Sequence, residues 1–196
     1  TLTLGVLAAA PAAHGASSAT ETVHTIAPSA QNPDLAINEA GDAIVAYVVG
    51  SGSGEAFVRR LSAQGTLGAA VKVSADGEEA FGPEVVLLAD GRAFVVWRSG
   101  AFATNRSARG RFVEVDGTLG PVITVAAAPN TGQATDRDVI ELEAVRGSDG
   151  DITVSWENQD FNSSSSGELE MRRVTPAGGL QPAGGPLSNI SLDSGV

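Results

Sequence analysis

The sequence predicts an all-β fold made of three tandem repeats of roughly fifty residues each. Three observations predict it. An aromatic residue follows a glycine by six positions in every repeat, an arginine and a second glycine recur after it, and turn residues such as Asp-Gly separate short β-like runs. The only tyrosine of the chain and both of its tryptophans occupy the aromatic position. No later stretch keeps a helical period, so we expect few helices.

Each of the three copies has a glycine, an aromatic residue, an arginine and a second glycine, in that order. They are Gly41, Tyr47, Arg59 and Gly65 in the first copy, Gly91, Trp97, Arg111 and Gly117 in the second, and Gly150, Trp156, Arg172 and Gly178 in the third. Each copy holds four short runs rich in β-formers, and Asp-Gly between such runs is a strong hairpin signal. We therefore predict three four-stranded antiparallel blades of an incomplete β-propeller, a fold that closes with four to eight blades. A two-sheet β-sandwich is the alternative.

The chain divides into five segments, taken in order. Residues 1–19 form an apolar run followed by small residues, which is typical of a secretory signal peptide whose start has been cut off. Residues 20–30 resemble the last run of a repeat and predict an orphan outer strand. Residues 31–77, 78–132 and 133–196 are the three blades, and we expect further repeats of the same chain beyond Val196.

The second run of each repeat indicates how the blades are buried. In the third copy Ile152, Val154 and Trp156 share one face of the strand and polar residues share the other. In the first two copies both faces are apolar or small. A strand that is buried on both faces lies between two layers, as it does in a stack of blades.

Composition narrows the classes of partner. The 23 acidic residues outnumber the 12 basic ones, for a net charge of −11, so the chain offers no basic face for nucleic acid or an anionic membrane. There are no cysteines, which excludes disulfides and thiolate metal sites. The apolar run at the start is too short to span a membrane. We expect an exported protein, extracellular or at the cell surface.

The repeat pattern resembles that of a known group of proteins. The pattern consists of Gly, five residues, Trp or Tyr, then an arginine-containing strand and Gly-Thr-Leu-Gly. It is similar to repeats of secreted bacterial β-propeller-type proteins of largely unknown function. The resemblance covers residues 32–191. It implies the architecture and implies no particular activity.

The repeated side chains favour scaffold roles over a site. The aromatic residues end apolar strands and are expected in the core, with sugar stacking as the alternative. The arginines are expected to form a repeated ion pair or to lie over the blade surface, with an anion-binding array as the alternative. We expect no cofactor or metal, since turn chemistry alone explains the acidic turns Asp90-Gly91 and Asp149-Gly150-Asp151. Calcium at these turns is the alternative.

No catalytic residue stands out from the sequence. Paired carboxylates would suit glycoside hydrolysis, but nothing sets two apart. The carboxylates considered are Asp136, Asp138, Glu141, Glu143, Glu157 and Asp160. A serine triad is disfavoured because His24 is the only histidine after the signal and no nucleophile elbow is present.

Function is therefore predicted only in outline. The leading hypothesis is an exported, non-catalytic module that binds a protein or a glycan through rim loops, and the long loops 99–107 and 158–167 are the best candidates for that surface. The alternative is a carbohydrate-active enzyme, a glycosidase or a lyase, whose site lies on the central axis and is completed by further repeats.

Overall fold

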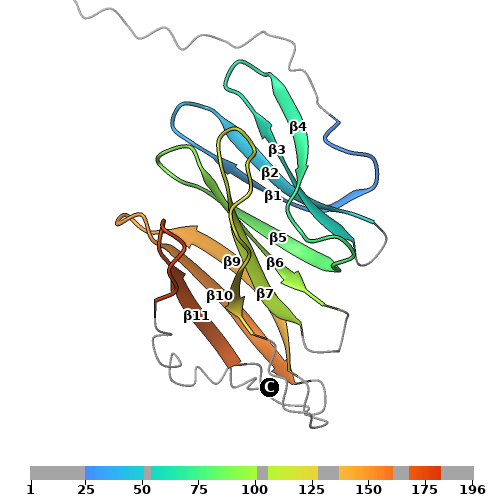
Figure 1. The fold of residues 1–196 in the computed structure, drawn as a ribbon, viewed down its shortest axis with the longest axis vertical. Helices are drawn as coiled ribbons and strands as arrows, with labels where there is room; N and C mark the ends of the chain where they lie inside the picture. Colours follow the sequence, from blue (N-terminus) through green and yellow to red (C-terminus); the bar gives the residue numbers. More distant parts are fainter. Residues whose placement is uncertain (1–24, 51–53, 101–105, 128–136, 161–167, 182–196) are drawn as a thin grey trace, which may run out of the picture.

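The computed structural model describes residues 25–50, 54–100, 106–127, 137–160 and 168–181. Within these ranges every regular element is a β-strand, and no helix is long and apolar enough to cross a membrane. Three antiparallel sheets follow one another along the long axis of the molecule (Figure 1). The prediction of an all-β fold with repeated antiparallel sheets is confirmed.

Each sheet is built from strands that are consecutive in the chain. The first sheet contains β1 (Ala30–Ile37), β2 (Ala43–Val49), β3 (Glu55–Leu61) and β4 (Leu67–Lys72). The second contains β5 (Ala80–Leu87), β6 (Ala93–Ser99), β7 (Ser107–Val113) and β8 (Ile123–Ala126). The third contains β9 (Arg137–Arg146), β10 (Ile152–Asp160) and β11 (Glu168–Val174), and its predicted fourth strand lies outside the described residues.

The repeated glycines lie in the turns between strands. Gly91 has φ +86° between β5 and β6, and Gly117 has φ +89° between β7 and β8. In both turns the glycine N–H donates to the carbonyl oxygen three residues earlier. A residue with a Cβ rarely adopts this left-handed conformation, which explains why the sequence repeats glycine there. The other four repeat glycines have the same geometry: Gly41, Gly65, Gly150 and Gly178.

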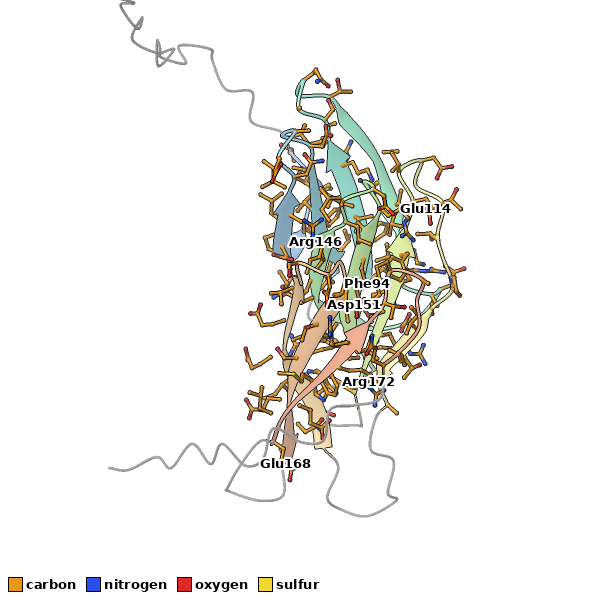
Figure 2. All side chains as sticks on the ribbon, turned by 90° about the vertical axis from the view of Figure 1, so that its left-hand side faces the viewer. Phe94, Glu114, Arg146, Asp151, Glu168 and Arg172 are labelled. Atoms are coloured by element: carbon orange, nitrogen blue, oxygen red, sulfur yellow. The ribbon has the colours of Figure 1, made fainter. Side chains whose placement is uncertain are left out.

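The middle sheet is buried on both faces, as the run of apolar residues on β6 predicts. One core lies between the first and second sheets and includes Ile44, Val58 and Trp97. A second core lies between the second and third sheets and includes Phe94 and Trp156. Figure 2 labels Phe94 within this stack. The three sheets therefore stack like blades, with a core between each neighbouring pair. A sandwich has two sheets and one core, so the β-sandwich alternative is wrong.

Two predicted segments fall partly or wholly outside the described residues. The signal peptide, residues 1–19, lies outside them entirely. Of the predicted outer strand, residues 20–30, the described part from 25 to 29 forms no strand, and Ala30 already belongs to β1. Ile26 nevertheless accepts a hydrogen bond from Arg59, as Val73 after β4 and Val125 of β8 do from the corresponding arginines.

Candidate functional site

The repeated aromatic side chains belong to the core. Tyr47 is 1% exposed, Trp97 is fully buried and Trp156 is 3% exposed. Tyr47 stacks on Phe57 with ring centroids 5.9 Å apart, and Trp97 Nε1 donates to Glu78 Oε1 at 3.3 Å. Because no aromatic face is open to solvent, these residues cannot form a platform for sugar rings.

The repeated arginines connect each sheet to the segment that precedes it. Arg172, labelled in Figure 2, lies on the third sheet and reaches back to the second. The Nη1 donors and their carbonyl acceptors are Arg59 to Ile26 at 2.7 Å, Arg111 to Val73 at 3.1 Å and Arg172 to Val125 at 2.7 Å. In these contacts their partners are main-chain carbonyls and not the carboxylates of an ion pair, and a stem that lies over the blade surface stays a prediction. These Nη1 donors are directed at protein atoms, while Nε of Arg172 is buried without a hydrogen-bond partner among the described residues.

The acidic turns pair with arginines. Asp90 Oδ2 accepts from Arg92 Nε at 2.8 Å, and Asp149 and Asp151 both pair with Arg173. No group of carboxylates or histidines among the described residues is arranged to hold a metal ion. Turn geometry and ion pairing account for these residues.

Within the described residues, the first strand of each sheet pairs with one neighbouring strand only, and we call these first strands the inner strands. These strands are β1, β5 and β9, and β5 packs against both of the others (Figure 1). Arg146 of β9, labelled in Figure 2, donates from Nη1 to the carbonyl oxygen of Leu87 at the end of β5 at 3.3 Å. The three inner strands therefore bring residues that are far apart in the chain to one row.

A bulge at the same position in each inner strand shapes this row. The pairing register shifts between Gln31 and Asp34 in β1 and between Phe81 and Glu84 in β5, and β9 has the corresponding shift. The bulged residue has a positive φ in each case. The three residues are Asn32 at +48°, Gly82 at +43° and Glu141 at +46°. A bulge re-aims the side chains that follow it.

A carboxylate stands two residues after each bulge. Asp34, Glu84 and Glu143 occupy the same position on β1, β5 and β9, and we call these three residues the inner-strand carboxylates. Asp34 Oδ2 accepts a hydrogen bond from the main-chain N–H of Val85 at 2.7 Å, and this bond joins β1 to β5. Asp34 and Glu84 are half-buried and Glu143 is exposed.

Glu84 has the most altered environment of the three. Burial is the largest cause that raises the pKa of Glu84, to about 8. The negative charges of Asp34 and Glu143 and a hydrogen bond to Asp34 act in the same direction, whereas the positive charge of Arg98 opposes them. At neutral pH the carboxyl group of Glu84 is therefore mostly protonated and can donate a proton.

The other carboxylates considered from the sequence have different surroundings. Asp138 is fully buried, accepts a hydrogen bond from the main-chain N–H of Arg106 at 2.9 Å and pairs with its guanidinium at 3.9 Å. Glu141 is the bulge residue of β9, while Glu157 and Asp160 lie on β10. Asp136 and His24 lie outside the described residues.

Sequence reasoning missed Asp34 and Glu84, although a signal for them existed. Each inner-strand carboxylate precedes the first repeat glycine by seven residues in all three copies. Alignment on Gly41, Gly91 and Gly150 therefore places an acidic residue at one position of every repeat. That regularity sets three carboxylates apart from the other twenty.

Comparisons with known proteins bear on the fold. No family model matches the chain, and no curated protein matches it significantly. Among solved structures, an endo-arabinase from Bacteroides thetaiotaomicron matches 80% of this chain with a TM-score of 0.53 and 11% identity. An α-L-arabinofuranosidase from Fusarium graminearum matches 79% with a TM-score of 0.56 and 10% identity. A xylan β-1,4-xylosidase from Bacillus halodurans matches 78% with a TM-score of 0.51 and 15% identity.

The chain is shorter than these structures and spans 61%, 48% and 33% of their lengths, respectively. At such low identity the likeness shows the fold, which is the β-propeller that the repeats predict. The same likeness overturns the leading functional hypothesis of a non-catalytic module that binds through rim loops. Solved structures of this fold are named as glycosidases, and the inner strands gather carboxylates, so the findings favour the carbohydrate-active alternative.

Proposed function

We propose that this chain forms part of a glycoside hydrolase whose reacting groups lie on the inner strands of its propeller blades. One observation carries the proposal. Asp34, Glu84 and Glu143 occupy the same position on three neighbouring inner strands, so they form one row. Hydrolysis of a glycosidic bond uses a protonated carboxyl group as general acid and an ionised carboxylate as base or nucleophile.

Glu84 is suited to the role of general acid. Burial raises its pKa to about 8, so it holds a proton at neutral pH where an exposed glutamate has lost it. A general acid works best when its pKa lies near the working pH. We assign to Glu84 the transfer of a proton to the leaving-group oxygen.

Asp34 and Glu143 are suited to different tasks. Asp34 hydrogen-bonds to Glu84, and the carboxyl groups of an acid and base pair are separated by about 5–9.5 Å, which is too far for a direct hydrogen bond. Asp34 therefore acts on Glu84 by raising its affinity for the proton. Glu143 is exposed on the other side of Glu84, where a water molecule or a sugar can reach it. We assign to Glu143 the role of base or nucleophile.

The class of substrate follows from the similar structures. Their names specify arabinose- and xylose-containing polymers or their fragments, and we extend this class to the present chain. Further repeats beyond Val196 would extend the row of inner strands, which stays a prediction. Export is part of the proposal, because polysaccharides lie outside cells and residues 1–19 resemble a signal peptide.

The test is hydrolysis of arabinan, xylan and aryl pentosides by the chain and its variants. We expect release of reducing sugar, and a loss of at least about a hundredfold in kcat for Glu84→Gln and for Glu143→Gln. Asp116→Asn, in an exposed turn between β7 and β8, serves as the matched control and should keep the activity. Release of an unsaturated sugar would indicate a lyase, and full activity in Glu84→Gln would remove the assigned acid; both contradict the proposal.

A further inference from the structure

Arg98 is the cation that the middle sheet places beside the row of inner-strand carboxylates. It directly follows the repeat tryptophan on β6, where the first sheet has Val48 and the third has Glu157. Glu84 pairs with Val96 across the two strands, and Arg98 lies two residues further along β6 on the same face. Such a diagonal pair is within reach of a long side chain.

Gly82 makes room for the guanidinium. A Cβ atom at Gly82 would lie 2.7 Å from Arg98 Nη2 and 3.4 Å from its Cζ, so Arg98 lies directly against the bulge of β5. Gly82 also has the positive φ of the bulge. The equivalent residues of the other sheets, Asn32 and Glu141, have side chains, and their sheets have no arginine at the position of Arg98.

Glu141 is exposed at the bulge of β9, a strand of the neighbouring sheet that packs against β5 and β6. Its φ of +46° is one that glutamate rarely adopts, whereas asparagine and glycine at the equivalent bulges tolerate it. Burial is the largest influence on Arg98 and lowers its pKa, and the attraction of Glu141 is the largest opposing effect, followed by those of Asp138 and Glu84. An unfavourable backbone conformation that persists at a charged cluster is a reason to look for a function.

Charged groups of both signs act on the guanidinium of Arg98. Its Nε is buried and has no hydrogen-bond partner within the described part of the chain. Arg106, which precedes β7, repels it and is itself paired with Asp138. Among the carboxylates that attract Arg98, Glu141 has the largest effect, and Asp138 is already paired with Arg106.

We propose that Arg98 is a positioning residue of the inner-strand site, which supplies the counter-charge to Glu84, and that Glu141 holds Arg98 in place. The inference rests on the proposed function for its meaning in catalysis. The charged groups that act on Glu84 are Asp34 from β1, Glu143 from β9 and Arg98 from β6.

The test follows the titration of the Glu84 carboxyl group by NMR in the whole chain, labelled with ¹³C at glutamate side chains. In Arg98→Met the midpoint should move to higher pH by about one unit, because a nearby positive charge is lost. Arg98→Lys should restore most of the shift. Both readings need only a folded chain and no substrate.

Glu141→Gln separates positioning from simple electrostatics. Loss of a negative charge would by itself lower the midpoint of Glu84, whereas release of Arg98 from its place raises it. We expect the rise, and we expect no change in the control Glu170→Gln on β11, which removes the same charge elsewhere.

A fall of the midpoint in Glu141→Gln, or no shift in Arg98→Met, overturns the inference. If Arg98→Met fails to fold, the test uses Arg98→Lys and Glu141→Gln instead. An unchanged midpoint of Glu84 in Glu141→Gln also overturns the inference. Hydrolysis assays on the same proteins keep the two proposals distinct. Shifted titrations without hydrolysis would remove the proposed function and leave the assignment of Arg98.

Discussion

Glu84 binds its proton more tightly in the folded chain than in the unfolded chain, and stability should depend on pH for this reason. Its pKa rises from an ordinary value of about 4.3 to about 8 on folding. Between these values the folded chain holds the extra proton, so the free energy of unfolding falls as pH increases, and the loss is complete above the folded pKa.

Glu84→Gln should remove this part of the pH dependence. The glutamine cannot ionise, so its free energy of unfolding should fall less than that of the original chain between about pH 5 and about pH 8. Urea denaturation at a series of pH values measures the difference. Glu170→Gln should keep the original slope, and equal slopes in all three proteins would contradict the protonation assigned to Glu84.

At the scale of one blade, the repeated arginine is expected to contribute to stability, because it joins the third strand of the blade to the preceding segment by hydrogen bonds. Arg111 donates from Nη1 to Val73, and from Nε and Nη2 to Gly120 at 2.9 and 2.7 Å. Arg111→Met keeps the apolar stem and leaves both carbonyls without their donor. We expect a loss of about 2–3 kcal/mol in the free energy of unfolding, measured by urea denaturation.

Arg109→Met is the matched control on the same strand. Arg109 is 41% exposed and pairs with Glu78 at 3.2 Å. Glu78 is only 8% exposed but keeps hydrogen bonds from Trp97 and Ser99. Loss of the partly exposed Arg109 should therefore cost about 1 kcal/mol or less. A larger loss in Arg109→Met than in Arg111→Met would contradict the structural role given to the repeated position.

The whole molecule depends on its middle sheet, since both cores include residues of that sheet. Phe94 is fully buried and packs on Phe112 with ring centroids 5.0 Å apart. Phe94→Ala should lower the free energy of unfolding by about 3–5 kcal/mol. Because each outer sheet packs on the middle one, hydrogen exchange should become faster in β2 and β10 as well as in β6.

Val122→Ala is the control for the loss of stability expected in Phe94→Ala. Val122 is 41% exposed and lies outside both cores, so its truncation should change the stability by no more than about 0.5 kcal/mol. Faster exchange in β6 alone, with β2 and β10 unchanged, would mean that the sheets unfold independently and would contradict the shared core.

Much of the architecture could be predicted from the sequence because its causes are local. Gly91 and Gly117 recur where a turn needs a positive φ, and the apolar run on β6 requires a layer on each side. Trp97 and Trp156 fill the space between sheets. These features repeat along the chain, so a comparison of the chain with itself finds them.

The site could not be predicted in the same way, because it arises between sheets. Asp34 lies fifty residues before Glu84 in the sequence, and the N–H of Val85 reaches it only because β1 and β5 pack together. The contact of Arg98 with the bulge at Gly82 depends on the register shift in β5. The sequence by itself determined the repeats, their turns and their buried aromatic residues. Only the tertiary structure decided which of many carboxylates share one row, since burial and neighbouring charge depend on how the sheets stack.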